Sequence, residues 1–206
     1  MGFYEIGRWL VDVNQDEARG RWILIIYRVP QDPPGRRTYV WRFLRQLGAI
    51  YLQQAAAILP DRPELRTAVE TLAARIRDFT GEVSVLETTS PSPEWEQELL
   101  NRFNQARCAE YGEVVENIER FEDEVRRETG KGKFTFAELE DIEADWEKLQ
   151  RWYERVRARD FFESPDRLSV AEALERGHQA LDTFATAVYT CEGVQADTHG
   201  EPDSKT

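Results

Sequence analysis

The chain has 206 residues and a formal net charge of −12, and hydrophobic residues make up 41% of it. This length and composition are typical of a globular protein with its own core, and the acidity excludes unspecific attraction of the whole chain to nucleic acid. The charge is unevenly divided, because residues 1–85 hold 12 Arg and no Lys against 10 acidic residues, whereas the remainder holds 15 basic and 29 acidic residues. The sequence therefore predicts two electrostatically different regions.

The two cysteines, Cys108 and Cys191, lie far apart and form no CxxC motif. This usage indicates neither a zinc site nor a disulfide framework and is typical of a reducing compartment. No apolar run approaches the roughly 20 residues that a membrane span needs. The first twenty residues contain four acidic side chains, which do not fit a secretory signal. We therefore expect a cytoplasmic protein that does not contact a membrane.

Residues 21–90 carry the pattern of a ferredoxin-like domain, after an N-terminal arm of residues 1–20. The apolar run RWILIIYRV is typical of a strand that is covered on both faces. The next predicted elements are a helix from Thr38 to just before Gly48, two strand segments within 49–60 divided by a bulge or bend, a helix from Pro63 that ends before Gly81, and the strand EVSVLET. The order βαββαβ predicts two helices on one face of an antiparallel sheet.

Residues 91–192 are predicted to form a region of helices. The first follows SPSPEWEQ, where Ser92 can cap it, and its apolar residues are spaced three and four apart as in a coiled coil. A capping box of Thr135 and Glu138 opens a second helix with the same spacing. These two helices are predicted to pack as a long antiparallel hairpin.

A further helix is predicted after the hairpin, beginning at a second capping box of Ser169 and Glu172. Residues 193–206 are polar and are expected to form a disordered tail. The predicted fold class is therefore α+β, with a ferredoxin-like βαββαβ domain followed by a long antiparallel helical hairpin and a further C-terminal helix.

The carboxylates of the helical half raise the question of a metal site. Glu175 and His178 have the Glu-x-x-His spacing of di-iron bundles, but such a site needs two pairs, and the only other histidine, His199, lies in the expected tail. No GxSxG motif is present, and TGKGK lacks the pattern and the preceding strand of a P-loop. The sequence predicts no metal site, no cofactor and no catalytic residue.

A group of arginines around the first strand and the first helix is the best candidate site. We call it the arginine platform and propose as its members Arg28, Arg36, Arg37, Arg42 and Arg45, with Gln54 beside them. Arginine offers a forked, permanently charged set of donors that suits tetrahedral oxyanions and nucleic-acid phosphates. In the alternative interpretation these arginines form only the solvated face of the helix and pair with the acidic half. Arg28 fits that alternative least, because it ends an apolar strand.

Several stretches of the chain resemble a known family. The stretch from Trp22 to Thr88, with the motifs YRVP, GAIYLQQ and ILPD, and the segment RVRARDFFESPDR at 155–167 are similar to the N-terminal domain of the bacterial chromate-resistance regulator family ChrB. The similarity covers about residues 21–190. It implies a regulatory role in chromate resistance, and it does not cover the larger C-terminal domain of full-length members.

The ferredoxin-like part also resembles small CRISPR-associated endonucleases and a domain of the phenylacetate-pathway repressor PaaX. In the nuclease the first strand ends in Tyr-Asp-Val, and the aspartate is implicated in metal binding. The corresponding residues here are Tyr27, Arg28 and Val29. A guanidinium group repels the cation that a carboxylate would hold, so the comparison implies no magnesium-dependent cleavage at this position. Arg28 instead indicates contact with an anion or an interdomain salt bridge.

Three functions follow from the sequence, in decreasing order of support. The first is a non-enzymatic, chromate-responsive transcriptional regulator, in which the arginine platform contacts DNA or a chromate oxyanion and the helical hairpin mediates assembly into a homodimer. The second is a structural or dimerisation module that binds neither DNA nor an oxyanion. The third is a metal-dependent nuclease that uses a carboxylate such as Asp32.

Overall fold

The computed structural model describes residues 20–32 and 34–198, and their side chains up to residue 193. The chain divides into two compact units, residues 1–103 and 104–206. Most of the predicted N-terminal arm, residues 1–19, lies outside the described residues. No helix among those that the structure describes is long and apolar enough to cross a membrane.

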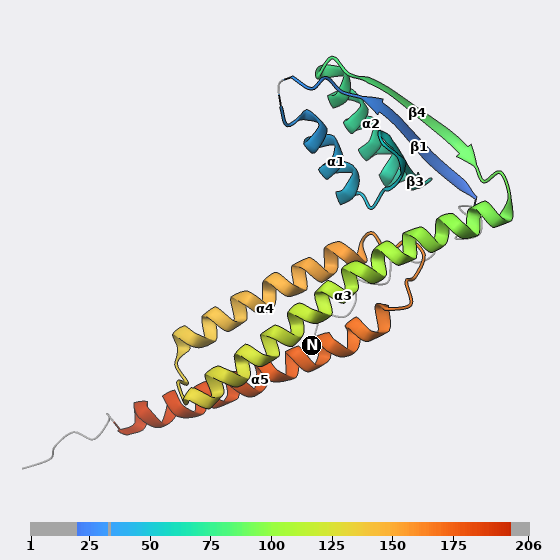
Figure 1. Ribbon diagram of the computed structural model, residues 1–206. Helices are drawn as coiled ribbons and strands as arrows, with labels where there is room; N and C mark the ends of the chain where they lie inside the picture. The colour runs from blue at the N-terminus through green and yellow to red at the C-terminus, as the bar shows by residue number, and fades with distance from the viewer. Residues whose placement is uncertain (1–19, 33, 199–206) are drawn as a thin grey trace, which may run out of the picture. The chain divides into compact units, whose positions relative to one another are not determined.

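The first unit contains a four-stranded antiparallel sheet with two helices on one face (Figure 1). Its elements are β1 (Arg21–Arg28), α1 (Arg36–Gln46), β2 (Ile50–Gln53), β3 (Ala56–Pro60), α2 (Pro63–Asp78) and β4 (Glu82–Thr89). The strand order is β2-β3-β1-β4, so β1 lies between β3 and β4 and pairs with both. This arrangement confirms the ferredoxin-like domain.

The core of the first unit lies between the sheet and the helices. Alternate residues of a strand point to opposite faces, and Glu87, which pairs with Ile23, contacts Arg66 of α2. Ile23 and Ile25 therefore face the helices, where each is 1% exposed. Trp22 lies on the other face and stacks on Phe103, with 5.6 Å between the ring centroids. Both faces of β1 are thus covered at its first residues, as its continuous apolar run predicts.

The connection between β2 and β3 is a turn of Gln54 and Ala55, next to an irregularity in the strand register between Tyr51 and Gln53. Ala55 has a φ of 62°, a left-handed conformation that residues with a Cβ adopt at a cost. Its carbonyl accepts a hydrogen bond of 2.9 Å from the amide of Tyr27 on β1. The turn therefore contains none of the residues that usually signal one, and the sequence leaves the division of the two strands open.

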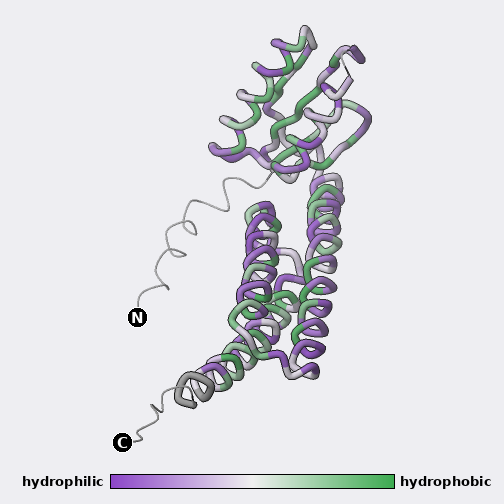
Figure 2. The backbone as a smooth tube through the Cα atoms, turned by 90° about the vertical axis from the view of Figure 1, so that its left-hand side faces the viewer, coloured by the Kyte–Doolittle hydropathy of each residue, from purple (hydrophilic) through white to green (hydrophobic). Residues whose placement is uncertain are grey.

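The second unit is formed by three helices that pack along one another (Figure 1). They are α3 (Pro93–Lys131), whose first turns belong to the first unit, α4 (Phe136–Arg157) and α5 (Arg167–Thr198). All three contribute to one apolar core, and hydrophobic and hydrophilic residues alternate along each of them (Figure 2). The predicted helical hairpin and further helix are therefore confirmed, and α5 packs against both helices of the hairpin.

The close packing of α5 depends on Gly177. A Cβ atom at this position would lie 2.5 Å from the ring of Trp146 on α4 and 3.1 Å from the side chain of Ile118 on α3. Only a residue without a side chain allows the three helices to approach this closely.

The helix ends follow the sequence in two places and depart from it in two others. Ser92 accepts a hydrogen bond from the amide of Trp95, and Thr135 accepts one from that of Glu138, as predicted for caps. The capping box at Ser169 is wrong, because α5 begins at Arg167 and the Ser169 hydroxyl donates backwards to the carbonyl of Asp166. In addition, α5 continues to Thr198, so residues 193–198 of the predicted tail are helical, whereas residues 199–206 lie outside the described residues.

Candidate functional site

A hollow of about 430 Å³ opens where β1 ends and α1 begins. It is lined by Tyr27, Arg28, Val29, Pro30, Gln31, Arg37 and Ala55. The structure thus brings two predicted members of the arginine platform together, one from the last position of the strand and one from the first turn of the helix. Gln54, a third, is exposed in the β2–β3 turn next to Ala55.

Arg28 and Arg37 are both exposed. Among the described residues, neither side chain makes a hydrogen bond or an ion pair. Arg28 lies opposite Glu82 in the strand register, but the two side chains form no salt bridge. The hollow therefore presents two guanidinium groups whose donors are open to an external acceptor.

The backbone adds positive potential to the same place. Gly35 caps α1 with a φ of 101°, and no acidic residue lies in the first turn of the helix. The N-terminus of a helix carries a partial positive charge, which a basic side chain in the first turn opposes. The charge of Arg37 therefore lowers the stability of α1 and raises the attraction of the hollow for anions.

Arg36 has a structural role, although it neighbours Arg37. Its Nη1 donates to the carbonyls of Asp32 at 3.1 Å and Phe79 at 2.9 Å, and its guanidinium lies over the Phe79 ring, 5.4 Å from the centroid. Phe79 caps the C-terminus of α2, the negative end of that helix. Arg36 therefore ties α1 to α2, and the solvated-face interpretation of the arginines is wrong for it.

The other two members of the platform lie further along α1, away from the hollow. Arg45 lies over the ring of Trp41, 5.3 Å from its centroid, and Arg42 is exposed. Neither side chain lines the hollow. The structure thus narrows the candidate site to Arg28 and Arg37, with Gln54 beside them.

A hydrogen-bonded pair of tyrosines, which the sequence did not indicate, lies at the hollow, where Tyr27 forms part of the lining. The hydroxyls of Tyr27 and Tyr51 lie 3.0 Å apart. Burial, and then the hydrogen bond with Tyr27, raise the pKa of Tyr51 above its ordinary value. The Tyr51 hydroxyl therefore stays neutral at physiological pH, and the hydrogen bond between the two hydroxyls links the end of β1 to β2.

The charges of two other arginines of the first unit, Arg21 on β1 and Arg66 on α2, are neutralised by neighbouring carboxylates. Arg66 donates to both carboxylate oxygens of Asp61, at 2.5 Å each, and to Glu87, while Arg21 lies 3.4 Å from Asp61. The Asp61 and Glu87 hydrogen bonds raise the pKa of Arg66. These arginines are held by carboxylates of their own unit and leave no open donor pair comparable to that of the hollow.

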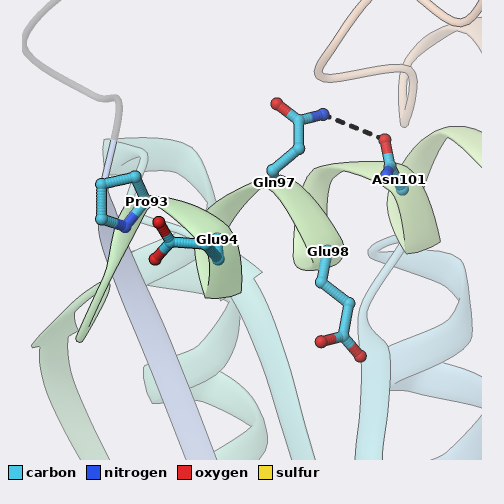
Figure 3. Close-up of a pocket in the computed structure, with 5 residues that line it drawn as sticks. All are labelled: Pro93, Glu94, Gln97, Glu98 and Asn101. Atoms are coloured by element: carbon cyan, nitrogen blue, oxygen red, sulfur yellow. Dashed lines mark hydrogen bonds between the residues drawn. The ribbon is translucent and has the colours of Figure 1, made fainter.

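A second surface depression lies on the first turns of α3 (Figure 3). Its lining residues are Pro93, Glu94, Gln97, Glu98 and Asn101, and the Gln97 amide donates to Asn101 at 3.0 Å. A hydrogen bond from Ser92 lowers the pKa of Glu94, which keeps that carboxylate charged. This depression carries only negative charge and is unsuited to an anion. Among the described residues, no group of three or more His, Cys, Asp or Glu side chains is arranged to hold a metal ion.

Comparison with known proteins agrees with the resemblance seen in the sequence. The family model described as "Protein ChrB, N-terminal" matches residues 37–195. Protein ChrB of Cupriavidus metallidurans is 32% identical over 92 residues, a stretch that covers 45% of this chain and 28% of that protein. The match to the family begins at Arg37, so it covers α1 except its first residue, all of α3 and α4, and α5 up to residue 195, whereas Arg28 precedes it. This chain belongs to the family of the N-terminal part of Protein ChrB.

Proposed function

We propose that the chain is a non-enzymatic regulatory protein of chromate resistance that contacts DNA through Arg28 and Arg37. The observation that carries this proposal is the pair of exposed guanidinium groups in one hollow, without a carboxylate partner among the described residues. The link to chromate and to regulation rests on the resemblance to the ChrB family described above.

The exposure of the two arginines favours a phosphate backbone over a free oxyanion as their ligand. An exposed guanidinium group gains little from one small anion, because both remain hydrated and salt screens their attraction. A polyanion releases condensed counterions when it is bound, so a few open arginines contribute measurably to its affinity. Arginine also pairs with phosphate through two parallel hydrogen bonds.

Binding of labelled DNA from upstream of the gene, followed by fluorescence anisotropy, tests the proposal. The double variant Arg28→Ala with Arg37→Ala is expected to bind at least tenfold more weakly than the unaltered chain, because two phosphate contacts are lost. Arg120→Ala is the matched control, since Arg120 is an exposed arginine of α3 that pairs with Glu116. Equal affinity of the double variant and the control would contradict the proposal.

A dimerisation module remains the second candidate, because apolar residues lie open on the sheet. Ile26 on β1 and Leu86 on β4 are 45% and 47% exposed. Both lie on the face that α1 and α2 leave uncovered. Alternate residues of a strand share a face, so Ile26 lies on the same face as Trp22, and the register between β1 and β4 places Leu86 on that face too. If this function holds, the unaltered chain binds no DNA and the Arg28 and Arg37 variants leave self-association unchanged, whereas Ile26→Asp weakens self-association in sedimentation experiments.

A further inference from the structure

The strand β4 forms an open edge of the sheet in the first unit. It is the last strand in the order β2-β3-β1-β4, and six of its eight residues are exposed (Figure 1). A strand in an antiparallel sheet directs about half of its backbone N–H and C=O groups to each side. Those of β4 that point away from β1 meet no further strand among the described residues, so they are open to one from outside.

Proteins usually protect such an edge, and β4 lacks the common forms of protection. Short length, proline, lysine and β-bulges all hinder the addition of another strand. β4 contains neither proline nor lysine, and its pairing with β1 runs without interruption from Glu82 to Thr89. The opposite edge, β2, has only four residues and a register irregularity between Tyr51 and Gln53. The sheet therefore has one protected edge and one that can accept a strand.

The centre of β4 is apolar and exposed on both faces of the sheet. Val85 lies opposite Ile25 in the register, so it points to the side of the helices, and it is 40% exposed. Leu86 lies opposite Leu24 and points to the other side, where it is 47% exposed. A strand added to this edge would remove apolar surface from water on both faces.

The two carboxylates of β4 do not prevent the approach of a second copy. Glu82 is the first residue of the strand, and Glu87 forms a salt bridge with Arg66 of α2. The two glutamates are an odd number of positions apart, so they point to opposite faces of the sheet. Residues that lie opposite each other in antiparallel strands share a face, so Glu82 of one copy never lies opposite Glu87 of another.

We propose that β4 pairs antiparallel with β4 of a second copy of this chain, so that the two sheets join into one across a two-fold axis at Val85. A two-fold axis perpendicular to a sheet places an edge strand antiparallel to its own copy. The hydrogen-bonding pattern of an antiparallel edge is unchanged by this rotation, so the two edges complement each other. The second copy also brings a strand of the same length with the same apolar centre.

The side chains favour an axis at Val85 over the neighbouring registers. With this axis, Val85 lies opposite the partner's Val85 and next to the buried Ile25 of its own copy. Leu86 then lies opposite the partner's Ser84. An axis one residue to either side would place a carboxylate opposite Val85 or Leu86, which is less favourable than an apolar or hydroxyl neighbour.

The dimer is expected to be weak and reversible. One pair of strands buries less surface than the roughly 1,200–2,000 Å² of a standard stable interface. The inference goes beyond the proposed DNA binding and does not rest on it, because no residue of β4 lines the hollow of Arg28 and Arg37. It also differs from the second candidate function, which buries the open face of the sheet rather than its edge.

Sedimentation velocity at chain concentrations from about 10 μM to 1 mM tests this contact. We expect the unaltered chain to shift from monomer to dimer as its concentration rises. Val85→Lys should associate at least tenfold more weakly, because two lysines would meet at the axis, and Val85→Glu should show the same loss. Gln53→Lys is the matched control, since it places a lysine at an exposed position of the other edge strand, and it should leave association unchanged.

An equimolar mixture of the Val85→Lys and Val85→Glu variants separates pairing at the axis from damage to the fold. Opposite charges then meet at the axis, so the mixture should form a heterodimer that neither variant forms as a homodimer. A variant that had lost its fold would not be rescued by mixing. A mixture that stays monomeric therefore overturns the proposal, as does an unaltered chain that is monomeric at about 1 mM. Self-association that Val85→Lys leaves intact and Ile26→Asp abolishes assigns the contact to the open face and overturns it as well.

Discussion

Arg37 occupies a position at which its charge lowers the stability of the fold. A guanidinium group in the first turn of α1 opposes the helix dipole, and no acidic residue in that turn compensates it. We predict that Arg37→Glu raises the free energy of unfolding by about 0.3–1 kcal/mol while it lowers DNA affinity. Chemical denaturation and anisotropy measure the two effects. Arg42→Glu, beyond the first turn of the same helix, should bring no such gain, and a loss of stability in Arg37→Glu would show that Arg37 has a structural role.

Gly177 provides a test of the helix packing at the same scale. We predict that Gly177→Ala lowers the free energy of unfolding by about 1–3 kcal/mol, because the added Cβ collides with the Trp146 ring. Gly112→Ala on α3 is the control: no atom lies within 4 Å of its Cβ position, so replacing a helical glycine there raises stability by about 0.5–1 kcal/mol. Thermal unfolding by circular dichroism measures both. Equal effects of the two substitutions would contradict the close packing of α4 and α5.

The sequence indicated the candidate site only in part, for reasons that individual residues make clear. Arg28 and Arg37 stand out by charge and position, but nothing in the sequence shows that Arg36 bonds to the carbonyl of Phe79, 43 residues away. Arg107, a buried arginine of α3 that forms an ion pair with Glu110, carries a signal in the sequence that was not recognised. It follows Phe103 and precedes Tyr111 at intervals of four, so it interrupts the buried apolar stripe of α3. A charged residue on such a stripe indicates a buried ionic group.

Among the secondary-structure elements, the β2–β3 turn is one that the sequence pattern does not predict. Strands and helices of the first unit follow from apolar periodicity, but the turn rests on a left-handed alanine that no propensity predicts. We predict that Ala55→Gly raises the free energy of unfolding by about 1 kcal/mol, since glycine adopts this conformation without a steric cost. Ala57→Gly, within β3, should lower it by about 0.5–1 kcal/mol. A destabilised Ala55→Gly variant, measured by urea denaturation, would contradict the turn geometry.

The ends of α5 show a second limit at this scale. Ser169 and Glu172 satisfy the capping-box spacing, yet the helix begins two residues earlier at Arg167. Arg167 donates its amide to the carbonyl of Ser164, whose own amide bonds to Asp160. The start of the helix is thus set by the segment that follows α4, and local spacing contains no information about that contact.

For the whole molecule, the uneven distribution of charge along the chain limits which part of it can bind a polyanion. The residues after 85 carry an excess of acidic side chains, so any attraction to DNA must come from the arginines of the first unit. The fold class was predictable because its βαββαβ order and its coiled-coil spacing are both long-range patterns. The pairing of residues across those elements was not, since it depends on tertiary contacts.

The dependence of DNA affinity on salt tests the central claim most directly. The logarithm of the association constant should fall linearly with the logarithm of salt concentration, and the double variant Arg28→Ala with Arg37→Ala should have a slope smaller by about two, one for each lost phosphate contact. Arg120→Ala should keep the slope of the unaltered chain. Identical slopes for all three proteins, or no binding at about 50 mM salt, where phosphate contacts are strongest, would contradict a regulator that acts through these arginines.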